Sequence, residues 1–272
     1  MNGWSLSSPI LSDASLTPER IWRTPGDRLL TGAAALDSGF VNESGDSPTI
    51  PIIGGTGALG TGLAYRWSLS GAKVVLGSRD ADRAAEVAAE VAGRSGGEVT
   101  GMANADAVEA GEVVFLTVPF ASQAETMKSV RDSLAPGQIV VDCTVPLATA
   151  VGGAPTRTVG VWQGSAAEQA QDLAPEGVTV VSALHTISAQ GLADPDWIAD
   201  EDVLVCGDRK ADKARAAELI ARIDGLRPVN AGRLETSRFV EQMTPMLISI
   251  NIRYKAHSGI RITGLPEGDP FS

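Results

Sequence analysis

The segment TIPIIGGTGALG, residues 49–60, decides the fold of this chain. Its mostly apolar start runs into a turn with Gly55, Gly57 and Gly60 in the spacing G-x-G-x-x-G, and a helix-forming stretch follows. In this order of strand, turn and helix, the three glycines allow a tight bend, close approach of a pyrophosphate, and packing of helix on strand. The helix N-terminus presents free amides to the phosphates. We therefore expect a bound dinucleotide.

Outward from this segment, strand-like and helix-like stretches alternate. Strands are predicted at residues 49–53, 73–76, 98–101, 113–118, 139–142, 178–182 and 203–207. Helices are predicted at residues 59–70, 80–92, 104–110, 122–134, 165–173, 211–223 and 234–254, the last of them bent at Pro245. Strands that are apolar on both faces and separated by helices indicate a parallel sheet covered on both sides. The expected fold is α/β, with a doubly wound parallel Rossmann sheet and a smaller C-terminal α/β domain.

Three regions are expected along the chain. Residues 1–48 are rich in Ser, Pro, Gly and Asp and are predicted to form a flexible N-terminal arm, with a partner-docking arm or an upstream start codon as alternatives. Residues 49–176 would form the dinucleotide-binding Rossmann domain, and residues 177–272 the smaller domain that closes the cleft. Pro51 conflicts with a central strand, because proline has no N–H to donate to the ladder. It is tolerable near the start of the strand or where its nitrogen faces a gap.

Charge and composition restrict the partners. The net charge of -11 argues against nucleic acid, which requires clustered Lys and Arg. Cys143 and Cys206 are isolated, and His185 and His257 stand alone, so neither a disulfide framework nor a metal site is expected. The chain start lacks the pattern of a signal peptide, and no apolar run approaches the roughly 18 residues of a membrane span. We expect a cytoplasmic protein that acts on small molecules.

The end of the second predicted strand indicates which dinucleotide is bound. A site for NAD places Asp or Glu there, where it hydrogen-bonds the ribose hydroxyls. This chain has Ser78 and Arg79 instead, and Arg83 follows on the same helical face. A hydroxyl and two guanidinium groups suit a 2′-phosphate, which a carboxylate would repel. The sequence therefore favours NADP.

Several further stretches resemble one family, the NADPH-dependent reductases of the 8-hydroxy-5-deazaflavin coenzyme F-420 (F420), or F420:NADP oxidoreductases. The stretches that carry the resemblance are GGTGALGTGLA (54–64), VVLGSRD (74–80), LTVPF (116–120), VVSALHTISA (180–189), VCGD (205–208), DGLRPVNAGRL (224–234), VEQMTP (240–245) and RYKAHSGIRITGL (253–265). They cover nearly the whole chain outside the arm. As a set they are far more specific than the glycine spacing alone.

The resemblance implies which residues hold two cofactors. NADP(H) would be bound by Gly55, Thr56, Gly57, Ala58, Leu59, Gly60, Ser78, Arg79, Arg83, Val118, Val145 and Ala189. The deazaflavin would be bound by His185, Ile187, Arg238 and Thr244. Arg83 stands where relatives have a lysine, and Gln242 where some have a smaller hydroxyl residue. His185 is the one candidate for a catalytic role, and a simple place in the pocket is its alternative role.

The reaction implied by the resemblance is reversible hydride transfer between NADPH and F420, carried out by a homodimer. A deazaflavin accepts a hydride and not single electrons, so the protein need only hold the two rings face to face. Two other functions remain open from the residues alone. One is an NADP-dependent imine-type reductase, which would need a proton donor that does not stand out here. The other is a non-catalytic NADP-sensing regulator with a similar glycine loop.

Overall fold

The fold is described by a computed structural model for residues 47–266, 268 and 271. The chain divides into two units, residues 1–41 and residues 42–272. The first unit lies outside the described residues, and so does the predicted arm at residues 1–48, apart from its last two positions. The sheet and helices described here all belong to the second unit.

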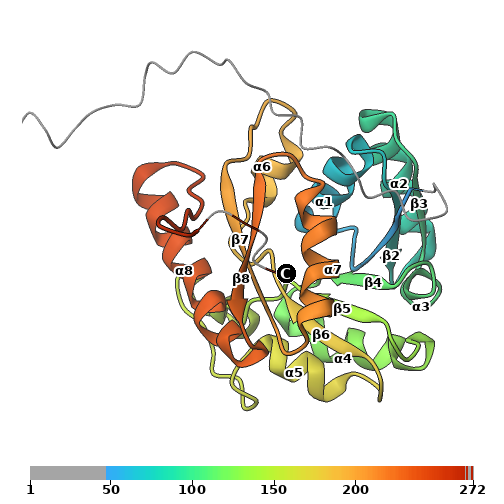
Figure 1. The fold of residues 1–272 in the computed structure, drawn as a ribbon. Coiled ribbons are helices and arrows are strands. Elements are labelled where there is room, and N and C mark those ends of the chain that lie inside the picture. The colour runs from blue at the N-terminus through green and yellow to red at the C-terminus, as the bar shows by residue number, and fades with distance from the viewer. Residues whose placement is uncertain (1–46, 267, 269–270, 272) are drawn as a thin grey trace, which may run out of the picture. The chain divides into compact units, whose positions relative to one another are not determined.

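The second unit is built on one eight-stranded sheet in the order β3-β2-β1-β4-β5-β6-β7-β8 (Figure 1). The strands are β1 (Thr49–Ile53), β2 (Lys73–Ser78), β3 (Val99–Ala103), β4 (Val113–Leu116), β5 (Ile139–Asp142), β6 (Thr179–Ser182), β7 (Glu201–Gly207) and β8 (Leu226–Gly232). The strands from β3 to β6 are mutually parallel. Because β1 lies between β2 and β4, the strand order reverses at β1, as in a Rossmann fold. The predicted α/β class is confirmed.

Helices cover both faces of the sheet. They are α1 (Ala58–Leu69), α2 (Ala81–Ser95), α3 (Asn104–Val108), α4 (Phe120–Val130), α5 (Ala166–Leu173), α6 (Ala189–Ala193), α7 (Lys210–Ala221) and α8 (Ser237–Tyr254), with short 3-10 turns at η2 (Arg131–Ser133), η3 (Ala148–Val151) and η4 (Leu234–Thr236). One core cluster joins α1, α2 and α7 to the sheet, and the other joins α3, α4 and α5. Alternate strand residues enter opposite clusters, as Ile52 and Ile53 do, so the strands must be apolar on both faces.

Pro51 lies in β1 without disturbing the sheet, because its nitrogen faces the gap before β4 begins. Ile53, two residues on and therefore on the same side of the strand, accepts a hydrogen bond from Thr117 beyond β4. The pairing of β1 with β4 covers only Ile52 and Ile53. A Cβ added to Gly111 would lie 2.9 Å from Cδ of Pro51, so the ring packs against the backbone that precedes β4. The missing donor thus falls outside the ladder.

The last two strands change direction. β7 pairs antiparallel with β6, at Val181 with Gly207 and Ser182 with Cys206, and β8 runs parallel to β7. Residues 201–205 therefore continue past the carboxyl end of β6, and Figure 1 shows β7 and β8 as long strands that reach up beside α6. We call β7 and β8 the antiparallel extension. The sheet is continuous across residue 177, so the smaller domain predicted from that position is attached through the same sheet, and its boundary stays a prediction.

Three elements differ from the sequence-based expectation. The predictions missed α6, which is only five residues long, and β8, an edge strand with Pro228 inside it. β7 begins two residues earlier than predicted and runs antiparallel to β6, a direction that the sequence did not predict. The last helix is continuous through Pro245, after the short turn at η4. No helix within the described residues is long and apolar enough to cross a membrane.

Candidate functional site

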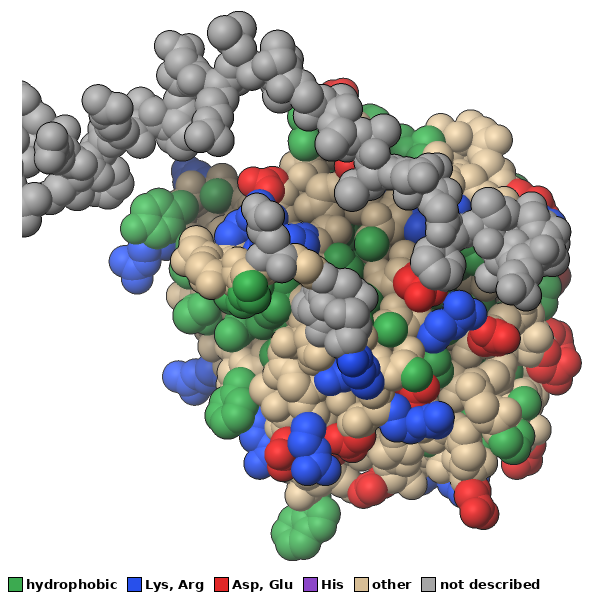
Figure 2. All heavy atoms as spheres, in the orientation of Figure 1, with side chains coloured by type: hydrophobic (Ala, Val, Ile, Leu, Met, Phe, Trp, Pro, Cys, Tyr) green, Lys and Arg blue, Asp and Glu red, His purple; other side chains and the backbone are tan. Residues whose placement is uncertain are grey.

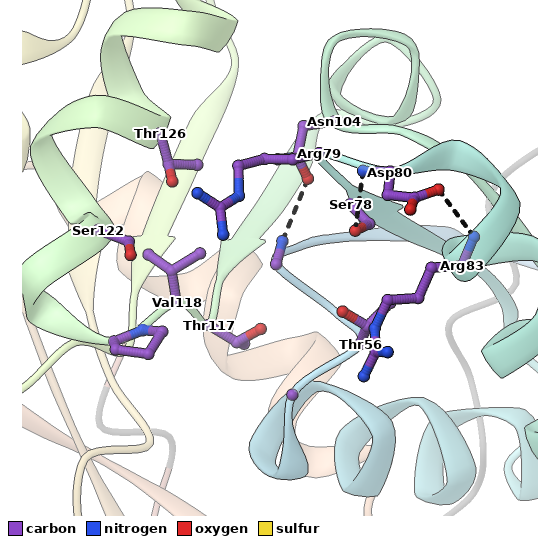
Figure 3. Close-up of a pocket in the computed structure, with 13 residues that line it drawn as sticks. Thr56, Ser78, Arg79, Asp80, Arg83, Asn104, Thr117, Val118, Ser122 and Thr126 are labelled. Atoms are coloured by element: carbon purple, nitrogen blue, oxygen red, sulfur yellow. Dashed lines mark hydrogen bonds between the residues drawn. The ribbon is translucent and has the colours of Figure 1, made fainter.

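A cavity of about 350 Å³ lies at the carboxyl ends of β1, β2, β3 and β4 (Figure 3). It is lined by Gly54, Thr56, Gly57, Ser78, Arg79, Asp80, Arg83, Asn104, Thr117, Val118, Pro119, Ser122 and Thr126. Six of these were predicted from the sequence to bind NADP(H): Thr56, Gly57, Ser78, Arg79, Arg83 and Val118. The strand order reverses beside β1, which is where open α/β sheets bind their ligands.

The glycine turn is packed too tightly for side chains at two of its three motif positions. A Cβ on Gly60 would lie 2.6 Å from Cα of Gly55, and a Cβ on Gly55 would lie 2.8 Å from the carbonyl oxygen of Ile52. At Gly57 the nearest atom to such a Cβ is 3.6 Å away, so this position is open. Gly57 therefore leaves room for a ligand, and Gly60 permits the contact of α1 with the turn, as predicted.

The glycine of the turn that has a positive φ is Gly54, one position before the motif. Its φ of +69° is in the left-handed region, and a Cβ there would lie 2.2 Å from Cγ1 of Val118. Its amide donates to Oδ1 of Asn104 at 3.3 Å. The N-terminus of α1 has no side-chain cap at Gly57 and no acidic residue in its first turn. No side chain of the cap therefore occupies the amides at the start of α1, and an anionic ligand can bind them.

Two arginines reach the cavity from different sides of the end of β2. In Figure 3 Arg79 extends toward α4, where Ser122 and Thr126 lie, whereas Arg83 extends from α2 toward Thr56. The Ser78 hydroxyl accepts the amide of Asp80 at 3.2 Å and keeps its own proton free to donate. The carboxylate of Asp80 caps α2 by accepting the amide of Arg83 at 3.1 Å. This arrangement gives a positive site for an anion despite an aspartate in its wall.

A second group of predicted residues follows β6. His185 is 6% exposed, and neither ring nitrogen has a hydrogen-bond partner. Burial lowers the pKa of His185 to about 4, so the ring is neutral at physiological pH. Leu184, directly before it, has a φ of +66°, a strained conformation for a branched side chain. Thr244 on α8 donates its hydroxyl proton to the carbonyl oxygen of His185 at 2.9 Å.

The remaining predicted residues lie outside the lining of the 350 Å³ cavity. Ile187 is buried beside His185, Val145 follows β5, and Ala189 begins α6. Arg238 extends from α8 to Glu168, with Nη2 at 3.2 Å from each carboxylate oxygen. The hydroxyl of Thr244 and the guanidinium of Arg238 thus make protein contacts in this structure. Within the described residues no group of three or more His, Cys, Asp or Glu is arranged to hold a metal ion.

Two buried carboxyl groups lie near the start of α5. Burial raises the pKa of Asp142 to about 7, against the opposing effect of hydrogen bonds from Gln123 and Thr144. Burial likewise raises the pKa of Glu241 to about 8, although it accepts the amides of Ala166 and Ala167 at 3.0 and 3.2 Å. Because Glu241 belongs to α8, these hydrogen bonds fasten α8 to the first turn of α5. Neither carboxyl group was predicted from the sequence.

Residue-by-residue reasoning also missed Asp80 and four uncharged polar residues of the cavity wall: Asn104, Thr117, Ser122 and Thr126. A usable signal was present for two of them. Asn104 follows β3 directly and Thr117 follows β4 directly, and the carboxyl ends of parallel strands meet at the edge where ligands bind. Ser122 and Thr126 come from α4, one turn apart, and carry no local motif.

Comparison with known proteins adds independent findings. A family described as NADP oxidoreductase, coenzyme F420-dependent, matches residues 49–146. The F420-dependent NADP reductase of Methanothermobacter thermautotrophicus is 43% identical over 223 residues, which are 80% of this chain and 96% of that protein. The enzyme of the same name from Methanocaldococcus jannaschii is 41% identical over 222 residues, 79% of this chain and 98% of that protein.

A solved structure shows that the likeness extends to the fold. It comes from Arthrobacter sp. FB24 and is described as a candidate F420-dependent NADP reductase. It is 26% identical to this chain, with a TM-score of 0.69, and the match covers 80% of this chain and 100% of that one.

Proposed function

Since this chain belongs to the family of F420-dependent NADP reductases, we propose that it transfers a hydride reversibly between NADPH and coenzyme F420. One observation in the structure carries the NADP half of the proposal. Ser78, Arg79 and Arg83 line the same cavity as Thr56 and Gly57 of the glycine turn (Figure 3). A dinucleotide with a 2′-phosphate requires this combination, an uncapped helix N-terminus for the pyrophosphate and cations for the extra phosphate.

The chain's own residues have three tasks in this reaction. The first-turn amides of α1 hold the pyrophosphate, and Gly57 leaves space for it to approach. Arg79 and Arg83 compensate the charge of the 2′-phosphate, and Ser78 donates a hydrogen bond to it. Val118, whose side chain packs against Gly54 of the glycine turn, would border the nicotinamide half of the dinucleotide. The nicotinamide supplies the hydride and the deazaflavin accepts it at carbon, so the protein contributes position more than chemistry.

The residues after β6 fit a polar aromatic partner. The ring of His185 is buried with two unpartnered nitrogens, which is costly unless a ligand supplies a hydrogen bond. A deazaflavin has ring carbonyls and a ring N–H, so it can satisfy a neutral imidazole as donor or as acceptor. The left-handed backbone at Leu184 maintains His185 in this position. We assign His185 and Ile187 to the deazaflavin pocket, and Arg238 and Thr244 to its wall on α8.

The function is tested by mixing the full-length protein with NADPH and oxidised F420 and following the visible absorbance of the deazaflavin. Loss of absorbance at a rate proportional to protein concentration is the expected result. NADPH binding measured by calorimetry, with no change in absorbance, would contradict the reductase function and favour an NADP sensor. Turnover of a cyclic imine with NADPH, but not of F420, would favour the imine-type reductase.

We further propose that the protein is a cytoplasmic homodimer. Phe239, Met246, Ile252 and Tyr254 on α8 are 66%, 53%, 66% and 72% exposed. Figure 2 shows apolar side chains protruding along the edge where Figure 1 places α8. An exposed apolar face of this kind is typical of an interface. The reduced, buried Cys143 and Cys206 fit a reducing compartment.

The dimer is tested by light scattering on the wild type and on Met246→Glu. The wild type should have twice the mass of the chain, and the variant should dissociate because a carboxylate would be buried against apolar side chains. Ala89→Glu, at an exposed position of α2, serves as the charge-matched control. A monomeric wild type would contradict this part of the proposal without affecting the reductase function.

A further inference from the structure

The two halves of the site are carried by segments far apart in the sequence. The glycine turn leads into α1, whereas His185, Ile187 and Ala189 belong to the chain that leaves β6. Residues 189–197, which we call the α6 segment, comprise α6 and the turn after it. Hydride transfer depends steeply on the distance between donor and acceptor, and a misplacement of about 1 Å can reduce the rate 100-fold. The contacts between the α6 segment and α1 therefore affect the rate of hydride transfer.

The first contact between them is close because α1 has a glycine at the crossing point. A Cβ on Gly62 would lie 2.7 Å from Cβ of Leu192 and 3.3 Å from the carbonyl oxygen of Ala189. Any side chain at position 62 would push α6 away from α1. Gly62 lies five residues after Gly57, so the α6 segment is docked directly behind the glycine turn.

Arg66, one turn further along α1, holds the α6 segment by its backbone. Its Nε donates to the carbonyl oxygen of Leu192 at 2.9 Å. Its Nη2 lies 3.1 Å from the carbonyl oxygens of Gly191 and Trp197 and also contacts that of Asp194. These four carbonyls at the end of α6 have a partial negative charge and converge on one guanidinium. A planar guanidinium meets several acceptors in a fixed fork from three nitrogens, whereas the three donors of a lysine all belong to one nitrogen.

Trp197 and Arg94 add further contacts to this junction. The guanidinium of Arg66 lies 5.4 Å from the ring centroid of Trp197, and a Cβ on Gly191 would lie 2.8 Å from that ring. From α2, Arg94 donates to the carbonyl oxygen of Ala193 at 2.8 Å and stacks on Tyr65 of α1 at 4.8 Å. The α6 segment is thus fastened to α1 and to α2.

We infer that Arg66 is a positioning residue, which fixes His185, Ile187 and Ala189 at a set distance from the glycine turn and so sets the rate of hydride transfer. This inference rests on the proposed function for its kinetic part. Arg66 does not line the cavity, and its side-chain hydrogen bonds all go to the α6 segment, so its effect passes through that segment.

The test uses the full-length protein with Arg66→Lys, which keeps the charge and removes the multiple hydrogen bonds. Arg131→Lys is the matched control, because Arg131 also donates to a carbonyl at a helix end, that of Leu173 at 3.1 Å. We expect Arg66→Lys to lower kcat by about 10-fold and to leave the KM for NADPH within about twofold. The isotope effect with 4,4-dideuterated NADPH should become more dependent on temperature, since the ring distance is less fixed. Arg131→Lys should match the wild type.

Hydrogen–deuterium exchange without F420 provides a readout that does not depend on turnover. The amides of residues 189–197 should exchange faster in Arg66→Lys, and those of β1 and β2 should not change. If Arg66→Lys folds poorly, Arg94→Lys can replace it, because this variant weakens the hydrogen bond to the carbonyl oxygen of Ala193. It should show the same changes in kcat, isotope effect and exchange, with smaller magnitudes.

An unchanged kcat, or a kcat that falls only in proportion to the folded fraction with an unaltered isotope effect, would overturn the positioning role. Unchanged exchange at residues 189–197 would overturn the junction itself. A wild type that does not reduce F420 would instead refute the proposed function, and faster exchange in the variant would then still support the junction.

Discussion

At the scale of single residues, Asp80 illustrates how local hydrogen bonds determine what a charged site accepts. Its carboxylate lies two positions after Ser78, close to where NAD-binding sheets have an acidic residue. Here the carboxylate accepts the amide of Arg83 and caps α2, so its charge acts on the helix N-terminus. Asp80 still lines the cavity, and the side chains that can donate hydrogen bonds into it at this end are those of Ser78, Arg79 and Arg83.

The preference for NADP is expected to depend on Arg79. Arg79→Ala should raise the KM for NADPH by roughly 10–100-fold, because a hydrogen bond to a charged group contributes about 1.5–3 kcal/mol. The KM for NADH, which lacks the 2′-phosphate, should change little. Steady-state kinetics with both dinucleotides measure this, with Lys128→Ala on the exposed face of α4 as control. Equal losses for NADPH and NADH would show that Arg79 is structural.

Substitutions at two glycines of the turn should have different effects, one on NADPH binding and the other on stability. Gly57→Ala places a methyl group in open space, so the Tm should stay within about 2 °C while NADPH affinity falls. Gly60→Ala places a methyl group 2.6 Å from Cα of Gly55, so the Tm itself should fall by several degrees. Thermal melts and NADPH titrations of the two variants measure both effects. If the Gly57→Ala variant binds NADPH as tightly as the wild type, the pyrophosphate does not lie against Gly57.

At the scale of elements, the local pattern predicted most strands because both faces are buried. β1, β2, β4 and β5 read as apolar runs between helices, and the structure confirms them. β8 was not predicted, because Arg227 is exposed and Pro228 interrupts the apolar run. Proline is tolerated there because β8 is an edge strand. The direction of β7 relative to β6 is set by the long connection through α6. The residues of β7 give no signal for this direction.

The same distinction applies to the candidate site. The glycine turn and the residues from 78 to 83 lie within one β-α-β unit, so spacing alone predicts that they meet. Ser122 and Thr126 enter the cavity from α4, and Glu241 meets α5 from a helix about 75 residues further along. Such contacts depend on tertiary packing, and no periodicity in the sequence encodes them.

The junction of α8 with α5 should give stability a pH dependence. The pKa of Glu241 is raised from 4.5 to about 8 by burial, with Asp142 and Glu168 adding to the shift. Its contribution to stability is therefore complete below about pH 4.5 and is lost as the pH rises through about 8. Asp142, with a pKa of about 7, acts in the same direction.

Replacing the carboxyl group by a neutral amide should reduce this dependence. In Glu241→Gln the fall in Tm between about pH 5 and about pH 8 should be shallower than in the wild type, where each 1 kcal/mol corresponds to roughly 2–4 °C. Melting curves across this range measure it, and Glu86→Gln on the exposed face of α2 is the control. Parallel curves for wild type and Glu241→Gln would mean that Glu241 is ionised in the folded protein.

At the scale of the whole molecule, the parallel half and the antiparallel extension are interlocked. One core cluster includes Ile50 of β1, Val205 of β7 and Ile220 of α7. Nε1 of Trp67 on α1 donates to the carbonyl oxygen of Leu219 on α7 at 2.7 Å. The two halves share buried area and hydrogen bonds as well as the sheet.

We therefore expect residues 49–266 to unfold cooperatively. Differential scanning calorimetry should show one main transition, with a calorimetric enthalpy equal to the van't Hoff enthalpy. Saturating NADPH should shift the whole transition upward and should not split it. Two separate transitions, of which NADPH moves only one, would support an independent domain from residue 177.

The antiparallel extension also bears on how such a protein could acquire a new reaction partner. The residues assigned to NADP lie mainly before residue 127, whereas the chain from residue 184 onward supplies the opposite wall. A graft that exchanges residues 184–266 between two proteins of this fold should transfer the choice of acceptor and retain the choice of dinucleotide. The seam of such a chimera lies along α1. The recipient would have to present a glycine at position 62 and an arginine at position 66 for the grafted wall to dock.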